Sequence, residues 1–299
     1  MTQNCPEHLV AGIDIGGSHI TIGLIDLNKK ECVENILVRY YVDSHGTAEE
    51  ILTKWADAIK ELWAQSGTTI QKIGFAMPGP FDYPNGICLI KGFNKYEALY
   101  GMNIREELAK RLNIEPGNIL FRNDAEAFLE GEVFCGSAKG YANAIGITLG
   151  TGLGSSICKS GKTIDAELSV MDYNGEYIEE SVSTRGLVRN YFRLTGKQLK
   201  DAKAVVALYP HDNNAVKSFE IFAKDLSWFL VRFIQKQSPE ILVIGGNIAN
   251  AWDKFMPQVM TYLSKELDIM PVIVKSSLME SAALIGGGVC NLSSTKSVI

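Results

Sequence analysis

The chain has little excess charge, no long apolar run and no leader-like N-terminus. Its 299 residues include 29 Lys and Arg against 34 Asp and Glu, which gives a net charge of −5. This balance argues against a nucleic-acid partner, because a face that neutralises many phosphates needs surplus basic residues. Glycine or charge interrupts each apolar stretch short of the roughly 20 residues that span a bilayer. Met1 to His8 shows no cationic and then apolar signal pattern, so we expect a cytoplasmic protein without a membrane partner.

The chain also lacks paired cysteines. Its six cysteines are scattered, and none belongs to a C-x-C or C-x-x-C pair. Such pairs are typical of zinc sites and redox centres. We therefore interpret the six as free thiols of a protein in a reducing compartment.

Two glycine-rich turns, each set between apolar strands, are the most informative feature that is present. The first runs from Asp14 to His19 and reads DIGGSH, and the second runs from Thr148 to Gly154 and reads TLGTGLG. Glycine has no Cβ, so backbone N–H groups in such a turn are open to a polyphosphate, and Asp14 adds a carboxylate for its metal. Neither turn is a Walker loop or a dinucleotide-binding G-x-G-x-x-G.

A carboxylate lies between the two turns, where Phe121 to Ala125 ends a predicted strand and places Asp124 at the start of a helix. A carboxylate in this place can take a proton from a hydroxyl during phosphoryl transfer. The alternative interpretation is that Asp124 simply caps the helix that follows it. The order of phosphate turn, acid and second phosphate turn favours the first interpretation.

These motifs resemble those of the ROK family (repressors, open reading frames, kinases) of bacterial sugar kinases, nearly from end to end. The matching segments are Asp14–Ser18, Gly74–Pro80, Asn123–Ala127, Leu149–Gly154, Ile244–Ile248 and Ser281–Gly286. One glycine turn alone is weak support for a family, whereas six segments in the right order are strong support.

The resemblance implies an α/β protein with the actin-like ATPase (ribonuclease H-like) fold, in which duplicated domains have a cleft between them. The length and the 46% of hydrophobic residues allow two domains with a core each. We expect an N-terminal domain at residues 1–124, with sugar-binding residues and the first phosphate turn, joined by a C-terminal helix at 282–299. Residues 125–281 would form the second domain, on the nucleotide side and with sugar-contacting Glu residues.

Apolar periodicity and turn residues predict the elements of both domains. Strands are expected at 10–15, 19–26, 32–42, 73–76, 81–83, 87–90, 119–122, 241–244 and 272–275, and on either side of the turn at 150–154. Helices are expected at 48–65, 104–112, 125–134, 185–194, 202–208, 214–237, 249–267 and 282–289. Thr47 and Glu50 form a predicted capping box ahead of the first helix.

The resemblance further implies a role for single residues. Asp124 would be the catalytic base, and Asn123 and Asn94 would bind sugar hydroxyls, although Asn94 also suits a solvated loop. Asp14 would hold Mg²⁺ through water, since this ion keeps several waters and takes few carboxylates. The remaining implied contacts are with ATP, whose phosphates and nucleoside would lie on Gly16, Gly17, Ser18, His19, Gly150, Thr151, Gly152, Gly245, Gly246 and Asn247.

The sequence departs from the family on the sugar-facing side. Members usually show Glu-x-Gly-His, a cysteine cluster that binds zinc, and a second Glu. Here Glu167 and Glu179 match the two Glu residues, while Ser169 replaces the Gly and Val170 replaces the His. The segment from Glu167 to Glu179 holds neither Cys nor His, and zinc needs about four N or S ligands, so we predict no zinc site.

We therefore predict ATP-dependent phosphorylation of a hexose or N-acetylhexosamine hydroxyl, by a glucokinase-like enzyme that forms a homodimer. Because the family's His is replaced here, the sequence does not define which sugar is the substrate: one buried donor changes which hydroxyl or N-acetyl group is tolerated. A sugar-binding protein with impaired catalysis is the alternative. A repressor is not expected, since only eight residues precede the first apolar run, which begins at Leu9, and leave no room for a helix-turn-helix.

Overall fold

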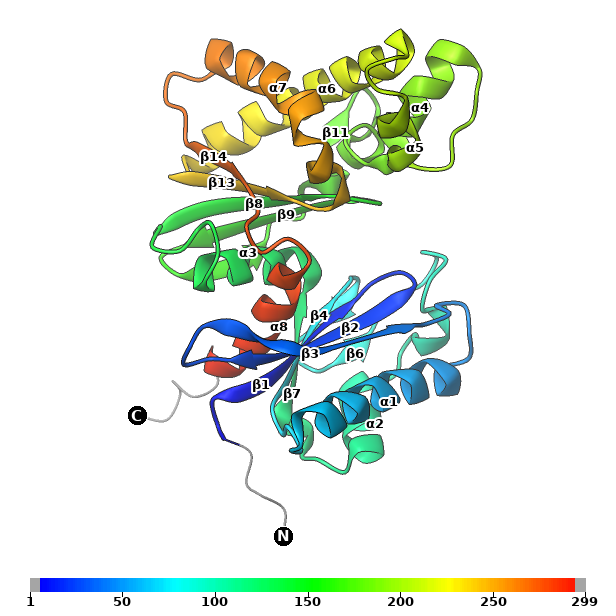
Figure 1. Ribbon diagram of the computed structural model, residues 1–299, viewed down its shortest axis with the longest axis vertical. Helices are drawn as coiled ribbons and strands as arrows, with labels where there is room; N and C mark the ends of the chain where they lie inside the picture. Colours follow the sequence, from blue (N-terminus) through cyan, green and yellow to red (C-terminus); the bar gives the residue numbers. More distant parts are fainter. Residues whose placement is uncertain (1–5, 294–299) are drawn as a thin grey trace. The chain divides into compact units, whose positions relative to one another are not determined.

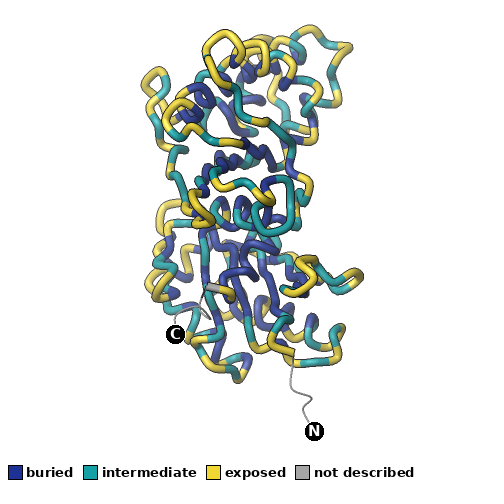
Figure 2. Tube along the Cα trace, turned by 90° about the vertical axis from the view of Figure 1, so that its left-hand side faces the viewer, coloured by how far each residue is buried: buried dark blue, intermediate teal, exposed yellow. Residues whose placement is uncertain are grey.

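The computed structural model describes residues 6–293, which fold as two compact units (Figure 1). Unit 1 runs up to Lys139 and resumes at Glu280, and unit 2 comprises Gly140–Met279. Buried residues occupy the interior of each unit, and exposed residues lie on its loops and on the outer sides of its helices (Figure 2). We expected the second domain to begin at residue 125. The structure instead keeps the helix at 124–134 in unit 1, and the reason is its packing against the C-terminal helix.

The described residues of unit 1 form one five-stranded sheet, four helices and several short elements. The strands are β1 (Leu9–Ile15), β2 (His19–Asp26), β3 (Glu31–Tyr41), β4 (Ile73–Met77), β5 (Phe81–Asp82), β6 (Ile87–Cys88) and β7 (Ile119–Asn123). The helices are α1 (Ala48–Ser66), α2 (Ile104–Leu112), α3 (Asp124–Phe134) and α8 (Ser281–Ser293), with 3-10 turns η1 (Glu97–Leu99) and η2 (Pro116–Asn118).

The elements of unit 2 follow the same plan. Its strands are β8 (Asn143–Leu149), β9 (Leu153–Lys159), β10 (Lys162–Asp165), β11 (Asp172–Tyr173), β12 (Glu176–Tyr177), β13 (Ile241–Gly245) and β14 (Val272–Lys275). Its helices are α4 (Thr184–Thr195), α5 (Ala202–Leu208), α6 (Asn213–Gln237) and α7 (Trp252–Glu266), with 3-10 turns η3 (Leu168–Val170), η4 (Ile178–Glu180) and η5 (Asn247–Ala251).

The two sheets have the same topology. The order is β3-β2-β1-β4-β7 in unit 1 and β10-β9-β8-β13-β14 in unit 2, so each reads third, second, first, fourth and fifth strand. The first three strands of each sheet are antiparallel, and the last two join the first in parallel. The turn β1–β2 and the turn β8–β9 therefore occupy equivalent positions. This confirms the duplicated α/β architecture expected from the sequence.

Local sequence explains why α1 covers one face of the unit 1 sheet. Its Thr47 side chain accepts the N–H of Glu50 while the Glu50 carboxylate accepts the N–H of Thr47, which is the predicted capping box. Apolar residues at helical spacing bury one side of α1, and Trp55 at its centre packs against Phe75 of β4. The helix ends at Ser66 and is capped by Gly67, which adopts the left-handed conformation that glycine tolerates.

The opposite face of this sheet is covered by α8, which also packs against α3 (Figure 1). A Cβ at Gly286 would overlap the carbonyl of Ala127, and one at Gly131 would overlap the carbonyl of Ala282. Only glycine lets the two helix backbones approach this closely. The described part of the C-terminal helix, α8, thus belongs to the same compact unit as the first sheet, whereas residues 294–299 of the expected helix lie outside the described residues.

Most predicted elements agree with the structure to within one or two residues, as is usual for helix and strand ends. The helix expected at 249–267 is divided, because η5 precedes α7. The strand β10 and the β11–β12 hairpin were not predicted. Within residues 6–293, no helix is long and apolar enough to cross a membrane.

Candidate functional site

The turn between β1 and β2 is closed by a backbone hydrogen bond, in which Gly16 N–H donates to the His19 carbonyl at 2.9 Å. Ser18 Oγ lies 2.8 Å from His19 Nδ1. Gly17 is exposed, has open space where a Cβ would stand, and lacks a positive φ. Neither packing nor backbone conformation therefore requires glycine at this position. Close approach of a ligand to the backbone would require it.

Asp14 is the second-last residue of β1, just before this turn; it is half-buried, and its carboxyl has a pKa raised to about 7. Desolvation is the main cause, and the charges of Asp124 and Glu280 add to it while Arg39 opposes it. Arg39 itself forms an ion pair with Glu280 at 3.2 Å. Carboxylates thus outnumber the one guanidinium, an arrangement that favours a bound cation.

No group of three or more His, Cys, Asp or Glu side chains that could hold a metal ion occurs in the part of the chain from residue 6 to residue 293. A site made only of protein ligands is therefore not formed there. Mg²⁺ does not need one, since it keeps several waters and binds through one or two carboxylates together with substrate phosphates. Asp14, with its raised pKa and neighbouring carboxylates, fits that donor set.

The junction of β7 and α3 assigns different tasks to Asn123 and Asp124. Asn123 is the N-cap, because its Oδ1 accepts the N–H groups of Ala125 at 2.8 Å and Glu126 at 3.2 Å. Its Nδ2 donates to the Tyr83 hydroxyl at 3.2 Å. The alternative that Asp124 is the cap is thus wrong, and the sugar-binding role of Asn123 stays a prediction for a side chain that is 9% exposed.

Asp124 is the first residue of α3, and it is an exposed residue. Its Oδ1 accepts the Ala125 N–H at 2.9 Å. Desolvation raises the pKa of this carboxyl, whereas Lys95 and the Ala125 N–H lower it. Asp124 therefore stands at an exposed position, and its carboxyl binds a proton more readily than that of an ordinary Asp.

The loop that carries Asn94 is attached to the first turn through Tyr96. Asn94 is exposed, adopts a φ of 54°, and donates its N–H to Glu97 Oε1 at 2.9 Å. Tyr96 is fully buried and donates its hydroxyl to the Gly16 carbonyl at 2.6 Å. Sequence reasoning missed Tyr96, since nothing in its neighbours indicates a partner 80 residues away.

The equivalent turn of unit 2 is closed by the Gly150 N–H, which donates to the Gly152 carbonyl at 3.0 Å. Gly150, like Gly17, has open space around it and no positive φ. Gly152 differs, because a Cβ there would overlap the Glu179 carboxylate. Thr151 is exposed between them. Both turns thus present one glycine that the fold itself does not require.

Glu179 lies directly against this turn. Its Oε2 accepts the Leu153 N–H at 2.8 Å, and its Oε1 accepts Arg185 Nη2 at 2.8 Å. Glu167 is exposed at a φ of 51° just before η3, and η3 packs against η4, which contains Glu179. The structure thus brings the segments of the two predicted sugar-contacting residues together.

The predicted nucleoside turn lies beside the same glycine turn. Gly245 pairs with Thr148 across β13 and β8. Gly246 has a φ of 85°, and a Cβ there would overlap the backbone of Leu149. Packing alone therefore explains this glycine. Asn247 is exposed and begins η5, so its nucleoside contact stays a prediction.

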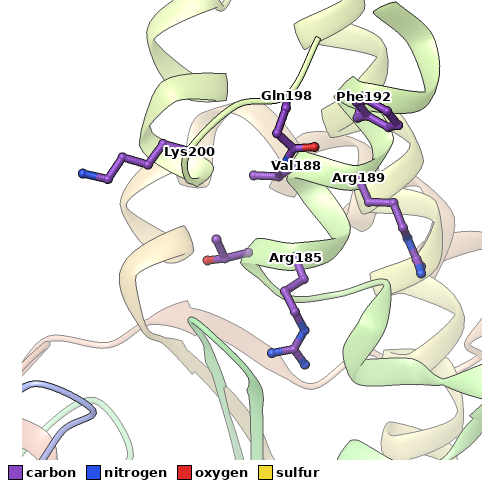
Figure 3. Close-up of a pocket in the computed structure, with 7 residues that line it drawn as sticks. Arg185, Val188, Arg189, Phe192, Gln198 and Lys200 are labelled. Carbon is purple, nitrogen blue, oxygen red and sulfur yellow. The ribbon is translucent and has the colours of Figure 1, made fainter. Parts of the chain in front are cut away.

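A basic pocket of about 290 Å³ opens at the first turns of α4. It is lined by Thr184, Arg185, Val188, Arg189, Phe192, Gln198 and Lys200 (Figure 3). Thr184 connects the pocket to the glycine turn, since its N–H donates to the Gly150 carbonyl at 2.9 Å. The amino group of Lys200 and the guanidinium of Arg189 point to opposite sides (Figure 3).

Two α/β units of one topology, with glycine turns at equivalent places, define the actin-like ATPase fold. The chain belongs to the ROK family, whose model matches residues 10–167 and 173–290. The fold agrees with that of solved ROK proteins. A ROK family glucokinase from Streptomyces griseus, in complex with glucose and AMPPNP, superposes with a TM-score of 0.77 at 21% identity, over 94% of this chain and 98% of that one.

Relatives of similar length are named as sugar kinases. A glucokinase of Thermotoga maritima is 26% identical, with 94% of this chain and 96% of the relative covered. An N-acetyl-D-glucosamine kinase of Histophilus somni is 24% identical, with 94% and 98% covered. The family match is interrupted at residues 168–172, around Val170, which stands where the sequence departs from the usual sugar-facing motif.

Proposed function

We propose that this protein is a sugar kinase that transfers a phosphoryl group from ATP to a hydroxyl of a hexose or N-acetylhexosamine. The observation that carries the proposal is the duplicated turn. Gly17 and Gly150 belong to turns that occupy equivalent places in the two units, and each leaves its backbone open where neither packing nor conformation requires glycine. Family membership and the names of the relatives support the same reaction.

Asp124 acts as the general base that takes the proton of the attacking hydroxyl. It is exposed, so a sugar can reach it, and its raised pKa makes it a better proton acceptor than an ordinary Asp. Because only the ionised carboxylate accepts a proton, we expect activity to fall as the pH drops through this raised pKa. Asn94, Asn123, Glu167 and Glu179 would hold the remaining hydroxyls.

Asp14 would hold Mg²⁺ through water. When bound there, the ion would supply positive charge that offsets the negative charge of the transferred phosphoryl group. The backbone N–H groups of the turns at 16–19 and 150–152 would donate to the phosphates, and the turn at 245–247 would take the nucleoside. These donors orient the phosphoryl group toward the hydroxyl that Asp124 deprotonates.

The test is ATP consumption across a panel of hexoses and N-acetylhexosamines, with Asp124→Asn beside the wild type. The asparagine keeps the shape of the side chain and can still accept the Ala125 N–H, but it cannot take a proton. We expect kcat to fall by roughly 10²-fold or more, the scale of general-base catalysis, with ATP binding retained. Asp57→Asn, at an exposed position of α1, is the matched control. Near-normal turnover in Asp124→Asn would refute the assignment.

A sugar-binding protein with impaired catalysis is the second candidate. The interrupted family match at 168–172 and the exposed Val170 favour it, because a donor that would contact the sugar is replaced by an apolar side chain. The two candidates differ in whether a sugar that binds to the protein is also phosphorylated. Sugar binding without ATP consumption would support the second candidate.

We further propose a homodimer that works in a reducing cytoplasm. The reducing environment is supported by the cysteines, since Cys32, Cys88, Cys135, Cys158 and Cys290 form no disulfide in the described part of the chain. Sedimentation equilibrium tests the proposed homodimer, and a molecular mass equal to that of one chain would refute it.

A further inference from the structure

Arg185, at the start of α4, connects three groups around the unit 2 turn. Its Nη2 donates to Glu179 Oε1 at 2.8 Å and to Glu180 Oε1 at 2.7 Å, and its Nε donates to Glu180 Oε2 at 3.3 Å. Its Nη1 donates to the Thr151 carbonyl at 3.2 Å. The same side chain lines the basic pocket (Figure 3). One guanidinium therefore contacts the glycine turn, two carboxylates and a cavity.

The partners of Arg185 differ in their proposed tasks. Glu179 is proposed to hold a sugar hydroxyl, and Thr151 belongs to the turn proposed to hold phosphate. Glu180 also pairs with Arg185, but it makes no contact with that turn among the hydrogen bonds of the described residues. A fork of fixed N–H donors is suited to hold a carboxylate and a carbonyl in a set relation.

Glu179 also contacts the glycine turn directly. Its Oε2 already accepts the Leu153 N–H, and the carboxylate fills the space beside Gly152. A displacement of Glu179 must therefore displace the turn or break these hydrogen bonds. The Glu179 side chain is 30% exposed, so its remaining lone pairs can still accept a hydroxyl from a ligand.

We propose that Arg185 is a positioning residue that couples sugar binding at Glu179 to phosphate binding at the Gly150–Gly152 turn. The inference rests on the proposed function. Sugar engagement of Glu179 is transmitted through the Arg185 guanidinium to the Thr151 carbonyl, which sets the turn for the phosphoryl donor. By linkage, the donor raises the affinity for sugar by the same factor by which sugar raises the affinity for the donor.

The experiment measures this coupling by calorimetry on the full chain, so it does not depend on turnover. AMPPNP is titrated with Mg²⁺ into the protein with and without saturating glucose, and again with N-acetylglucosamine. The ratio of the two AMPPNP dissociation constants is the coupling factor. We expect about tenfold for the wild type with the sugar that binds, within the usual range for coupled sites.

Three variants separate coupling from structural support. Arg185→Gln should bring the factor close to one, and Arg185→Lys, which keeps the charge without the fork, should leave an intermediate factor. Glu180→Gln is the matched control, because it removes a partner of Arg185 outside the turn, and it should keep the wild-type factor. Thermal unfolding of each variant verifies that unit 2 is folded.

Two results would overturn the inference. One is a wild-type factor of one, and the other is Arg185→Gln weakening each ligand alone while the factor stays unchanged, which would mark Arg185 as structural only. Failure of the proposed function gives a different result. In that case neither sugar binds, or a coupled pair of ligands binds without any ATP consumption.

Discussion

Asp14 should make the ligand-free protein less stable, and its removal should stabilise unit 1. Folding raises the pKa of this carboxyl from 3.8 to about 7. A raised folded-state pKa means that the contribution to stability is fully present below pH 3.8 and is lost as the pH rises through about 7. The neutral amide of Asp14→Asn avoids this loss. The variant is therefore expected to exceed the wild type in its free energy of unfolding at neutral and alkaline pH.

The magnitude follows from the two pKa values. The difference between 3.8 and about 7, at about 1.4 kcal/mol for each pKa unit, corresponds to about 4 kcal/mol above both values. Near pH 5 only the unfolded carboxyl is ionised, so the difference there is about 2 kcal/mol. The gain from Asp14→Asn should thus increase about 2.5-fold between pH 5 and pH 8.5.

Urea unfolding in a buffer with EDTA measures this gain. Replacing Trp228 and Trp252 by Phe in every variant leaves Trp55 and Trp63, so that fluorescence reports on unit 1 alone. Asp26→Asn is the matched control with the opposite sign. The N–H groups of Lys29 and Asn28 lower the pKa of Asp26, so its contribution is present above pH 3.8, and losing it should destabilise the protein at neutral pH. A gain for Asp14→Asn that does not change between pH 5 and pH 8.5 would refute the reasoning.

Further predictions concern packing and metal. Gly286→Ala places a Cβ against the Ala127 carbonyl and should lower the free energy of unfolding by about 1–3 kcal/mol or more, measured by urea denaturation; Gly117→Ala, which has open space, is the control. An equal, small effect of both would contradict the close packing of α3 and α8. Elemental analysis of the purified protein should find zinc well below one ion per chain, and a stoichiometric, tightly held zinc would show that the segment from Glu167 to Glu179 was misinterpreted.

The sequence predicted the regular elements well, because their signals are local. The capping box of Thr47 and Glu50 and the apolar spacing of α1 lie within one helix and need no knowledge of the fold. The irregular stretch around η3 and η4 carries no periodicity, so the β11–β12 hairpin was missed. The helix expected from Ala249 begins later because η5 intervenes.

The candidate site was predictable where glycine marks it and not where side chains meet over long distances. The turns at Gly17 and Gly150 were read from the sequence directly, and their placement agrees with the topology. Asn123 and Asp124 are adjacent polar residues, and only the backbone at the start of α3 decides that Asn123 is the cap. Tyr96 was missed because its hydroxyl bonds across 80 residues of chain.

The discontinuity of unit 1 has a consequence for biosynthesis. Unit 2 is one continuous segment, Gly140–Met279, whereas unit 1 needs α8 to cover its sheet and to pack against α3. A nascent chain that has emerged as far as Met279 contains all of unit 2 but lacks α8. Unit 2 is therefore expected to become protease-resistant on stalled ribosomes before unit 1 does, although translation begins with unit 1. Unit 1 is thus the unit whose synthesis begins first and the unit that is completed last, when α8 has been made.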